Sequence, residues 1–136
     1  MKLTLNEILN TPAGYELDAL IAKGVMGINL SQECEGDIYE EGDHWTCTYC
    51  SKVGYWGESF KHTIEPKQYS TDIADAWEVV EKLLPLFRFA LAQIDSGTKW
   101  FAQFENIEHF GEWKAFEAEE DTAPLAICRA ALLANF

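Results

Sequence analysis

The sequence predicts a single α+β domain in which helices cover an antiparallel sheet of three or more strands. Its 136 residues suffice for one domain with a buried core, since chains of this size bury roughly two-thirds of their unfolded surface. Hydrophobic residues make up 48% of the chain and aromatic residues 13%, which excludes general disorder. From residue 70 onward, the hydrophobic patterns follow the order helix, strand, strand, strand, helix.

Two short helices are expected at the start of the chain. Thr4 and Glu7 have the spacing of a capping box, which predicts a helix over about residues 4–10. Pro12 suits the first turn of a second helix, and apolar residues recur at helical spacing after it. We therefore expect a second helix near residues 12–23, with Thr11 as its N-cap.

Residues 28–68 have the weakest periodicity. Strand-like composition at 45–49 and 59–64 predicts a small hairpin. A structureless loop of this length would be unusual in a compact domain, so some interaction must order the segment.

A helix is predicted to begin at about residue 70 and to end before Pro85. Ser70 or Thr71 can cap it, and Asp72 favours a helix N-terminus. Four large apolar residues recur at spacings of four, three and four, and predict one buried stripe: Ile73, Trp77, Val80 and Leu84.

Three strands and a final helix follow. Side chains alternate over 87–91 and 100–104 around a turn at 95–97, and a third strand is expected over 112–118. Thr122 is the expected N-cap of the last helix. Sequential strands with short turns pair as an antiparallel meander. Because two strands have apolar residues on both faces, we expect cover on both sides, from the N-terminal helices or from a second copy of the chain.

The charge is strongly negative, with 23 acidic and 10 basic residues and a net charge of −13. This charge repels nucleic acid and anionic lipid, so neither is an expected direct partner. Six acids lie in residues 33–43 and seven in 105–121, which indicates either solvated loops or a surface for a basic partner. The candidate partner surface consists of Glu33, Glu35, Asp37, Glu40, Glu41, Asp43, Glu117, Glu119, Glu120 and Asp121.

Cysteine use indicates a reduced, cytoplasmic protein, because the chain opens with no secretory signal and has no membrane-spanning apolar run. Cys128 has the position of a small core residue. Cys47 and Cys50 form one Cys-x-x-Cys pair, a weak metal signal when it stands alone. We expect no cofactor; the alternative is a tetrahedral structural zinc that orders the segment through Cys34, Cys47, Cys50 and His62.

A small anionic ligand could bind near the predicted helix start at residue 70. A helix N-terminus attracts anions, aromatic rings stack on bases, and arginines offset phosphate charge. The candidate residues are Tyr69, Ser70, Thr71, Trp77, Arg88, Trp100 and Arg129. The alternative is that Trp77 faces the core, as its stripe position indicates. No catalytic triad or phosphate-binding loop is evident, so we expect no enzymatic activity.

Three segments together resemble the phage ABA sandwich domain family. They are YSTDIADAWEVVEKL at 69–83, TAPLAICRAALLA at 122–134, and the stretch from GYELD at 14–18 to VMG at 25–27. The resemblance covers residues 12–27 and 69–134 and leaves 28–68 as a variable insert in one domain of residues 1–136. It implies a small phage or prophage protein with an α/β/α sandwich and no defined catalytic residue.

The resemblance and the charge together favour a non-enzymatic accessory protein in the cytoplasm of an infected or lysogenic bacterium. We expect a homo-oligomer, such as a dimer, that antagonises a host factor by occupying a basic, nucleic-acid-binding surface. One alternative is sequestration of a cyclic nucleotide immune signal, and another is a structural role in the virion or in packaging. Double-stranded-RNA-binding domains share the helix and strand order, but the acids at 117–121 exclude RNA.

Overall fold

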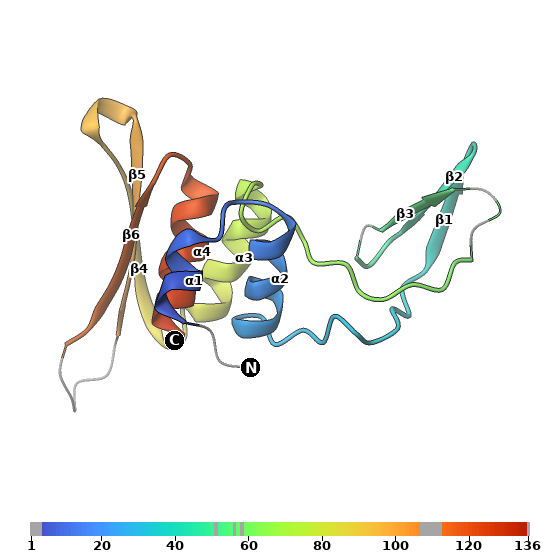
Figure 1. Ribbon diagram of the computed structural model, residues 1–136, viewed down its shortest axis with the longest axis horizontal. Coiled ribbons are helices and arrows are strands. Elements are labelled where there is room, and N and C mark those ends of the chain that lie inside the picture. The colour runs from blue at the N-terminus through green and yellow to red at the C-terminus, as the bar shows by residue number, and fades with distance from the viewer. Residues whose placement is uncertain (1–3, 51, 56, 58, 107–112, 136) are drawn as a thin grey trace.

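The computed structural model describes residues 4–50, 52–55, 57, 59–106 and 113–135. This part of the chain contains four α-helices and two three-stranded antiparallel sheets, so the fold is α+β as predicted. Figure 1 shows the helices in the middle of the molecule, with one sheet packed on them. The other sheet stands away from the helices on two extended connections. None of the described helices is long and apolar enough to cross a membrane.

The first two helices are α1 (Leu5–Asn10) and α2 (Tyr15–Gly24). The predicted capping box is present, because Thr4 Oγ1 accepts the Glu7 N–H at 3.2 Å while Glu7 Oε2 accepts the Thr4 N–H at 2.8 Å. Thr11 is not the N-cap of α2. It closes α1 instead, since its N–H and its hydroxyl both donate to the Glu7 carbonyl. Gly14 is the N-cap of α2, three residues later than expected.

Helix α3 (Ile73–Leu83) is capped by Asp72, whose carboxylate accepts the Asp75 N–H at 3.1 Å. The prediction that Ser70 or Thr71 caps this helix is therefore wrong. Ser70 is fully buried, and its hydroxyl donates to Asp18 in α2.

The predicted buried stripe of α3 is wrong except at Val80. The buried residues are Ala76, Val79, Val80 and Leu83, whereas Ile73, Trp77 and Leu84 are between 44% and 51% exposed. The buried face is rich in small and β-branched residues, and it packs against the alanine-rich helix α4 (Ala123–Ala134). Small side chains let the two helix axes approach closely, while a tryptophan at the interface would hold them apart.

The second sheet is the predicted meander of β4 (Phe87–Ile94), β5 (Lys99–Asn106) and β6 (Ala115–Glu120), in that order. Its register places Phe89 opposite Phe104 and Phe104 opposite Phe116. Strand β6 begins at residue 115, while residue 112, where the third strand was expected to start, lies outside the described residues. Thr122 caps α4 as predicted.

The two faces of this sheet have different surroundings. Phe89, Ala102 and Phe104 point toward the helices and join the main core. All four helices lie on this side, so the N-terminal helices do not cover the outer face (Figure 1). Alternation along the strands places Ala90, Ala92 and Phe101 on the outer face.

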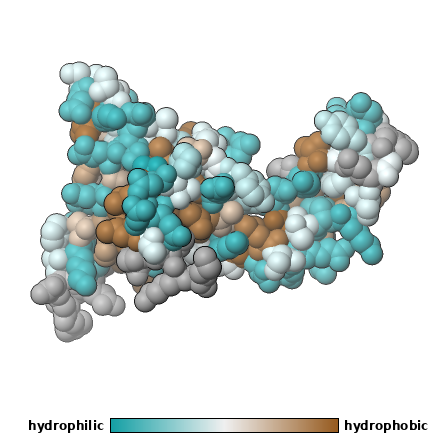
Figure 2. Space-filling model, viewed as in Figure 1, coloured by the Kyte–Doolittle hydropathy of each residue, from teal (hydrophilic) through white to brown (hydrophobic). Residues whose placement is uncertain are grey.

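The first sheet consists of β1 (Ile38–Glu41), β2 (His44–Cys47) and β3 (Val53–Tyr55) in antiparallel order. A hairpin in this region was predicted, but residues 59–64 are not one of its strands and contribute only an isolated bridge between Glu33 and Thr63. Phe60 and His62 instead pack their rings on Trp45 at centroid distances of 5.7 and 5.4 Å. We call residues 33–65 the β1–β3 module. Figure 2 shows it as a separate lobe beside the helices.

Candidate functional site

Three cysteines and one histidine converge inside the β1–β3 module. Cys34 precedes β1, Cys47 ends β2, Cys50 lies in the following turn and His62 lies in the returning segment. Their sulfur and nitrogen atoms all lie within 4.8 Å of one another. Cys34 Sγ is 3.6 Å from Cys47 Sγ, and Cys50 Sγ is 3.3 Å from His62 Nε2. We call these four residues the Cys3His cluster.

The backbone around the cluster is shaped to bring the thiols together. A Cβ atom at Gly36 would lie 2.6 Å from Cys47 Sγ and 2.5 Å from the Cβ of Tyr49, so a side chain there would displace Cys47 and Tyr49. The Gly36 N–H donates to the sulfur of Cys34, and the N–H groups of Tyr49 and Cys50 donate to the sulfur of Cys47. Such donors stabilise a thiolate more than a thiol.

These donors set the ionisation of the cluster. Burial opposes ionisation of Cys47, but the N–H groups of Cys50 and Tyr49, with Cys34 and His62, outweigh it and lower its pKa to about 6. Burial raises the pKa of Cys34 to about 11 against the donor from Gly36. The hydrogen bond to the Phe60 carbonyl raises the pKa of His62. Cys47 therefore loses its proton well before Cys34.

The orientation of His62 follows from its second ring nitrogen. Nδ1 lies 2.7 Å from the Phe60 carbonyl oxygen, which can only accept, so Nδ1 is the donor. In the neutral ring, Nε2 then has a lone pair, and this atom faces Cys50.

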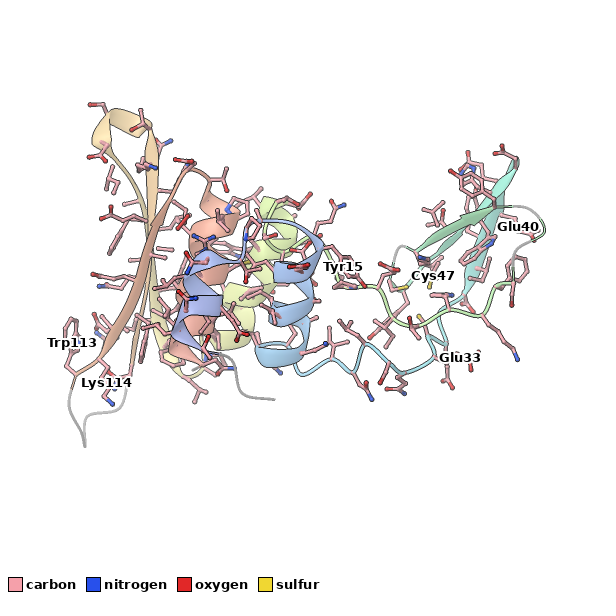
Figure 3. All side chains as sticks on the ribbon, in the orientation of Figure 1. Tyr15, Glu33, Glu40, Cys47, Trp113 and Lys114 are labelled. Carbon is pink, nitrogen blue, oxygen red and sulfur yellow. The ribbon has the colours of Figure 1, made fainter. Side chains whose placement is uncertain are left out.

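The acidic residues of 33–43 lie on the surface of the same module. All six are exposed, and in the described part of the chain none forms an ion pair with a lysine or arginine. Asp43 lies 3.4 Å from Nδ1 of His44. Figure 3 shows Glu33 and Glu40 on the periphery of the module and Cys47 in its interior. We call Glu33, Glu35, Asp37, Glu40, Glu41 and Asp43 the acidic segment.

The second group of predicted partner-surface acids has a different environment. Glu120 pairs with Arg129 at 2.7 Å, and Asp121 pairs with Lys99 at 2.5 Å. Glu117 accepts a hydrogen bond from Gln103 at 3.2 Å, and Glu119 is exposed. Two of these four carboxylates are thus neutralised within the chain, whereas none of the six residues of the acidic segment pairs with a described lysine or arginine.

The structure does not bring the predicted small-ligand residues together. Tyr69 and Ser70 are buried in the core, while Thr71 is exposed. Trp77 contacts Phe89 edge to face at 5.8 Å, and Trp100 packs against the core from β5. Arg88 lies on the outer face of the sheet, whereas Arg129 lies on the helical side, where it bonds Glu120 and the Thr11 carbonyl.

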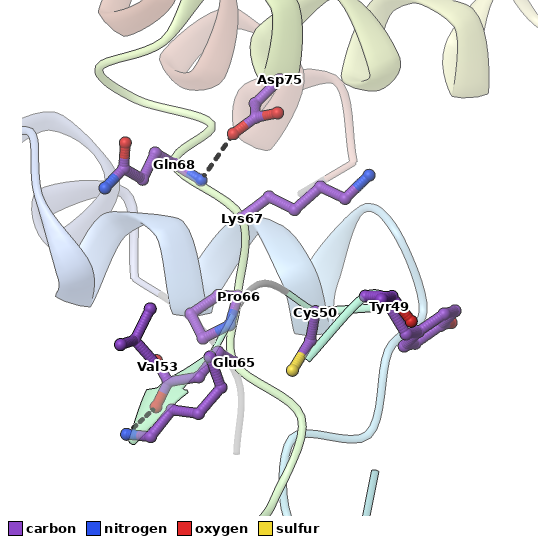
Figure 4. Close-up of a pocket in the computed structure, with 10 residues that line it drawn as sticks. Tyr49, Cys50, Val53, Glu65, Pro66, Lys67, Gln68 and Asp75 are labelled. Atoms are coloured by element: carbon purple, nitrogen blue, oxygen red, sulfur yellow. Dashed lines mark hydrogen bonds and ion pairs between the residues drawn. The ribbon is translucent and has the colours of Figure 1, made fainter. Parts of the chain in front are cut away.

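A cavity of about 610 Å³ that the sequence did not indicate lies between the module and α3 (Figure 4). Tyr49, Cys50, Lys67 and Asp75 are among its lining residues. Both lysines of its lining are matched by carboxylates, since Lys52 pairs with Glu65 at 2.9 Å and Lys67 with Glu78 at 2.8 Å. The cavity therefore offers no excess positive charge to a phosphate group.

The comparisons with known proteins fit this architecture. A model of the phage ABA sandwich domain matches residues 19–132, a range that includes residues 28–68. The chain belongs to the phage ABA sandwich domain family. A similar crystal structure is that of a phage protein from Bacillus cereus ATCC 14579, with a TM-score of 0.56 and 22% sequence identity over 91% of this chain and 93% of that one. At this identity the likeness shows the fold alone. No curated protein matches the chain.

Proposed function

We propose that this phage ABA sandwich protein is a non-enzymatic accessory protein that binds a basic protein surface through the acidic segment. The observation that carries the proposal is the exposure of six carboxylates, without a described lysine or arginine partner, on a module that stands apart from the helices. Unpaired surface charge of one sign steers a partner of the opposite sign.

The tyrosines of the module support the same kind of partner. Tyr39 is 58% exposed and Tyr55 is 63% exposed, and both lie on the face of the β1–β3 sheet opposite the buried Trp45. Arginine side chains stack on tyrosine rings and pair with carboxylates. An arginine-bearing surface therefore matches the acidic segment and the tyrosines together.

The environment of the thiols supports binding rather than catalysis. Cys34, Cys47 and Cys50 are buried within the module, and Cys128 is buried in the main core, where burial raises its pKa. A nucleophilic cysteine must be both ionised and accessible to substrate. Cys128 meets neither condition, and the other three thiols contact one another or His62.

The partner that we propose is a host protein with a basic surface that normally binds nucleic acid. Carboxylates repeated along an exposed module present negative charge to the same lysines and arginines that bind phosphates. Occupying such a surface would block a host factor, which is how a phage protein of this kind would antagonise host defence.

The test is capture from host lysate with two charge-matched variants. The binding variant is Glu35→Gln with Glu40→Gln and Glu41→Gln, and the control is Glu16→Gln with Glu81→Gln and Glu119→Gln; all six residues are exposed. The wild type and the control should retain the same basic protein at low salt, and competing DNA should release it. The binding variant should lose it. Equal loss by both variants, or no basic protein retained at low salt, would contradict the proposal.

A further inference from the structure

We propose that the Cys3His cluster is a structural zinc site that holds the β1–β3 module together. This inference concerns the interior of the module and does not depend on which partner the acidic segment binds. It rests on the number, chemical type and separation of the four ligand atoms, and on the groups that orient them.

The separations fit one tetrahedral ion. Zinc lies about 2.3 Å from a thiolate sulfur and about 2.0 Å from an imidazole nitrogen, so ligand atoms of a tetrahedral site are roughly 3.5–3.8 Å apart. The Cys34–Cys47 sulfurs are 3.6 Å apart, and Cys50 Sγ lies 3.3 Å from His62 Nε2. The remaining pairs also lie within 4.8 Å. Side-chain shifts of roughly 1 Å or less would complete the tetrahedron.

The surrounding groups orient two of the four ligands. The Phe60 carbonyl accepts from Nδ1 of His62 and leaves Nε2 as the ligand, as second-shell carbonyls do at zinc sites. The backbone N–H groups of Tyr49 and Cys50 donate to the sulfur of Cys47, and such donors stabilise a thiolate. The position of the Cys47 sulfur also requires glycine at residue 36, because a Cβ atom there would lie 2.6 Å from that sulfur.

Other uses of the same residues fit less well. A disulfide between Cys34 and Cys47 would need a sulfur separation of about 2.05 Å and would leave Cys50 and His62 unexplained. A thioredoxin-like pair lies at the N-terminus of a helix, whereas Cys47 and Cys50 connect β2 to β3. A catalytic zinc keeps one position open for water. Here four protein ligands are present, so no position of a tetrahedral ion is left for water.

The module needs such a centre because its apolar core is small. Its buried apolar residues are the three cysteines, with Ile38 and Ile64 packed against them, and Trp45, whose ring packs on Phe60 and His62. Segments below about 40 residues usually need a metal or disulfides to stay folded. The four ligands come from both ends of the module and from its central turn, so one ion would tie these parts together.

Zinc binding forms three Zn–S bonds and one Zn–N bond without oxidation or reduction. Each cysteine that is still a thiol releases its proton to solvent as its sulfur coordinates the ion. Affinity should therefore fall steeply in acid, as the thiolates and the imidazole take up protons.

The experiment measures metal in the full-length protein, purified without a polyhistidine tag and without added metal. We expect one zinc per chain in the wild type and in Cys128→Ala, a control that removes a thiol outside the cluster. Cys50→Ser and His62→Asn should lose most of the zinc. Circular dichroism should still show the helices, because α1–α4 form their own core. Cobalt added to the metal-free wild type should give thiolate charge-transfer bands and the strong visible bands of tetrahedral coordination.

Three results would overturn the inference. The first is a zinc content in the wild type no higher than in Cys50→Ser. The second is the weak spectrum of octahedral cobalt, and the third is a Cys34–Cys47 disulfide in the freshly purified protein. The two proposals fail separately: a protein with one zinc that captures no basic partner would contradict only the proposed function. A wild-type protein that captures a basic partner but contains no zinc when purified would contradict only the metal site.

Discussion

Asp18 accepts two hydrogen bonds from Ser70 and so joins α2 to the start of α3. Its Oδ1 atom lies 2.7 Å from both the backbone N and the hydroxyl oxygen of Ser70. The Ser70 oxygen in turn accepts the Gly14 N–H at 2.9 Å. Asp18 and Ser70 are the buried polar residues of the described core, at 5% and 0% exposure. A buried carboxylate requires such donors, so this contact ties α2 to the segment that leads into α3.

Replacing Ser70 by alanine should therefore destabilise the protein substantially. The Ser70→Ala variant removes one donor to the Asp18 carboxylate and leaves the Gly14 N–H without its acceptor. Leaving buried polar groups unsatisfied costs about 1–3 kcal/mol each, so we expect a loss of roughly 2–4 kcal/mol in the free energy of unfolding. Urea unfolding followed by circular dichroism measures it. The neighbouring exposed residue supplies the control, since Thr71→Ala should change stability by less than about 0.5 kcal/mol. Equal effects of the two variants would refute this role.

Two glycines make a matched pair that tests the packing of the module. A Cβ atom at Gly54 would lie 2.2 Å from the ring of Trp45, whereas one at Gly24 would lie 3.7 Å from Leu132 Cδ2, an ordinary contact. Gly54→Ala should displace Trp45 from Phe60 and His62, and so change the tryptophan fluorescence and lower the zinc content. Gly24→Ala should leave both unchanged, since alanine favours a helix. Unchanged metal binding in Gly54→Ala would mean that the Trp45 packing does not support the cluster.

The sequence predicts local features well because short-range chemistry determines them. The capping box at Thr4, the cap at Thr122 and the β4–β6 meander all follow from neighbouring residues, and the structure contains each. The buried face of α3 could not be predicted in this way. Ala76 and Trp77 are adjacent and both apolar, and the requirement for a close approach to α4 makes the smaller one the buried residue.

The candidate site was predictable in composition but not in arrangement. Counting cysteines and histidines indicates the four members of the Cys3His cluster, but their convergence depends on the close backbone approach at Gly36 and on the turn that contains Cys50. The ion pairs that neutralise Glu120 and Asp121 could not be predicted from the sequence either. Lys99 and Asp121 are 22 positions apart, and only the pairing of β5 with β6 brings the lysine beside that carboxylate.

Tyr69 should make stability fall in alkaline solution. Burial of this side chain, 1% exposed, raises its pKa from 10 to about 12. Between these values the unfolded chain loses the phenolic proton while the folded chain keeps it, so the free energy of unfolding decreases as pH rises. The decrease should reach roughly 2 kcal/mol near pH 12. Urea unfolding at about pH 9.5 and about pH 11.5 should show it in the wild type and much less in Tyr69→Phe. A parallel decrease in both proteins would assign the effect to other groups.

The outer face of the β4–β6 sheet should be where a second copy of the chain packs. Ala90, Ala92 and Phe101 form an apolar strip there, and Arg88 and Glu119 give the face charges of both signs. A two-fold axis could place the arginine of one copy near the glutamate of the other. In light scattering after gel filtration, the wild type should elute as a dimer and Phe101→Lys as a monomer. The fold should persist, because Phe101 lies opposite Glu119 within the same sheet, where lysine is compatible. Tyr15→Lys, at a 64% exposed apolar site on α2, is the control and should remain dimeric. A wild type that elutes as a monomer, or a Phe101→Lys variant that elutes as the wild-type dimer does, would rule out this interface.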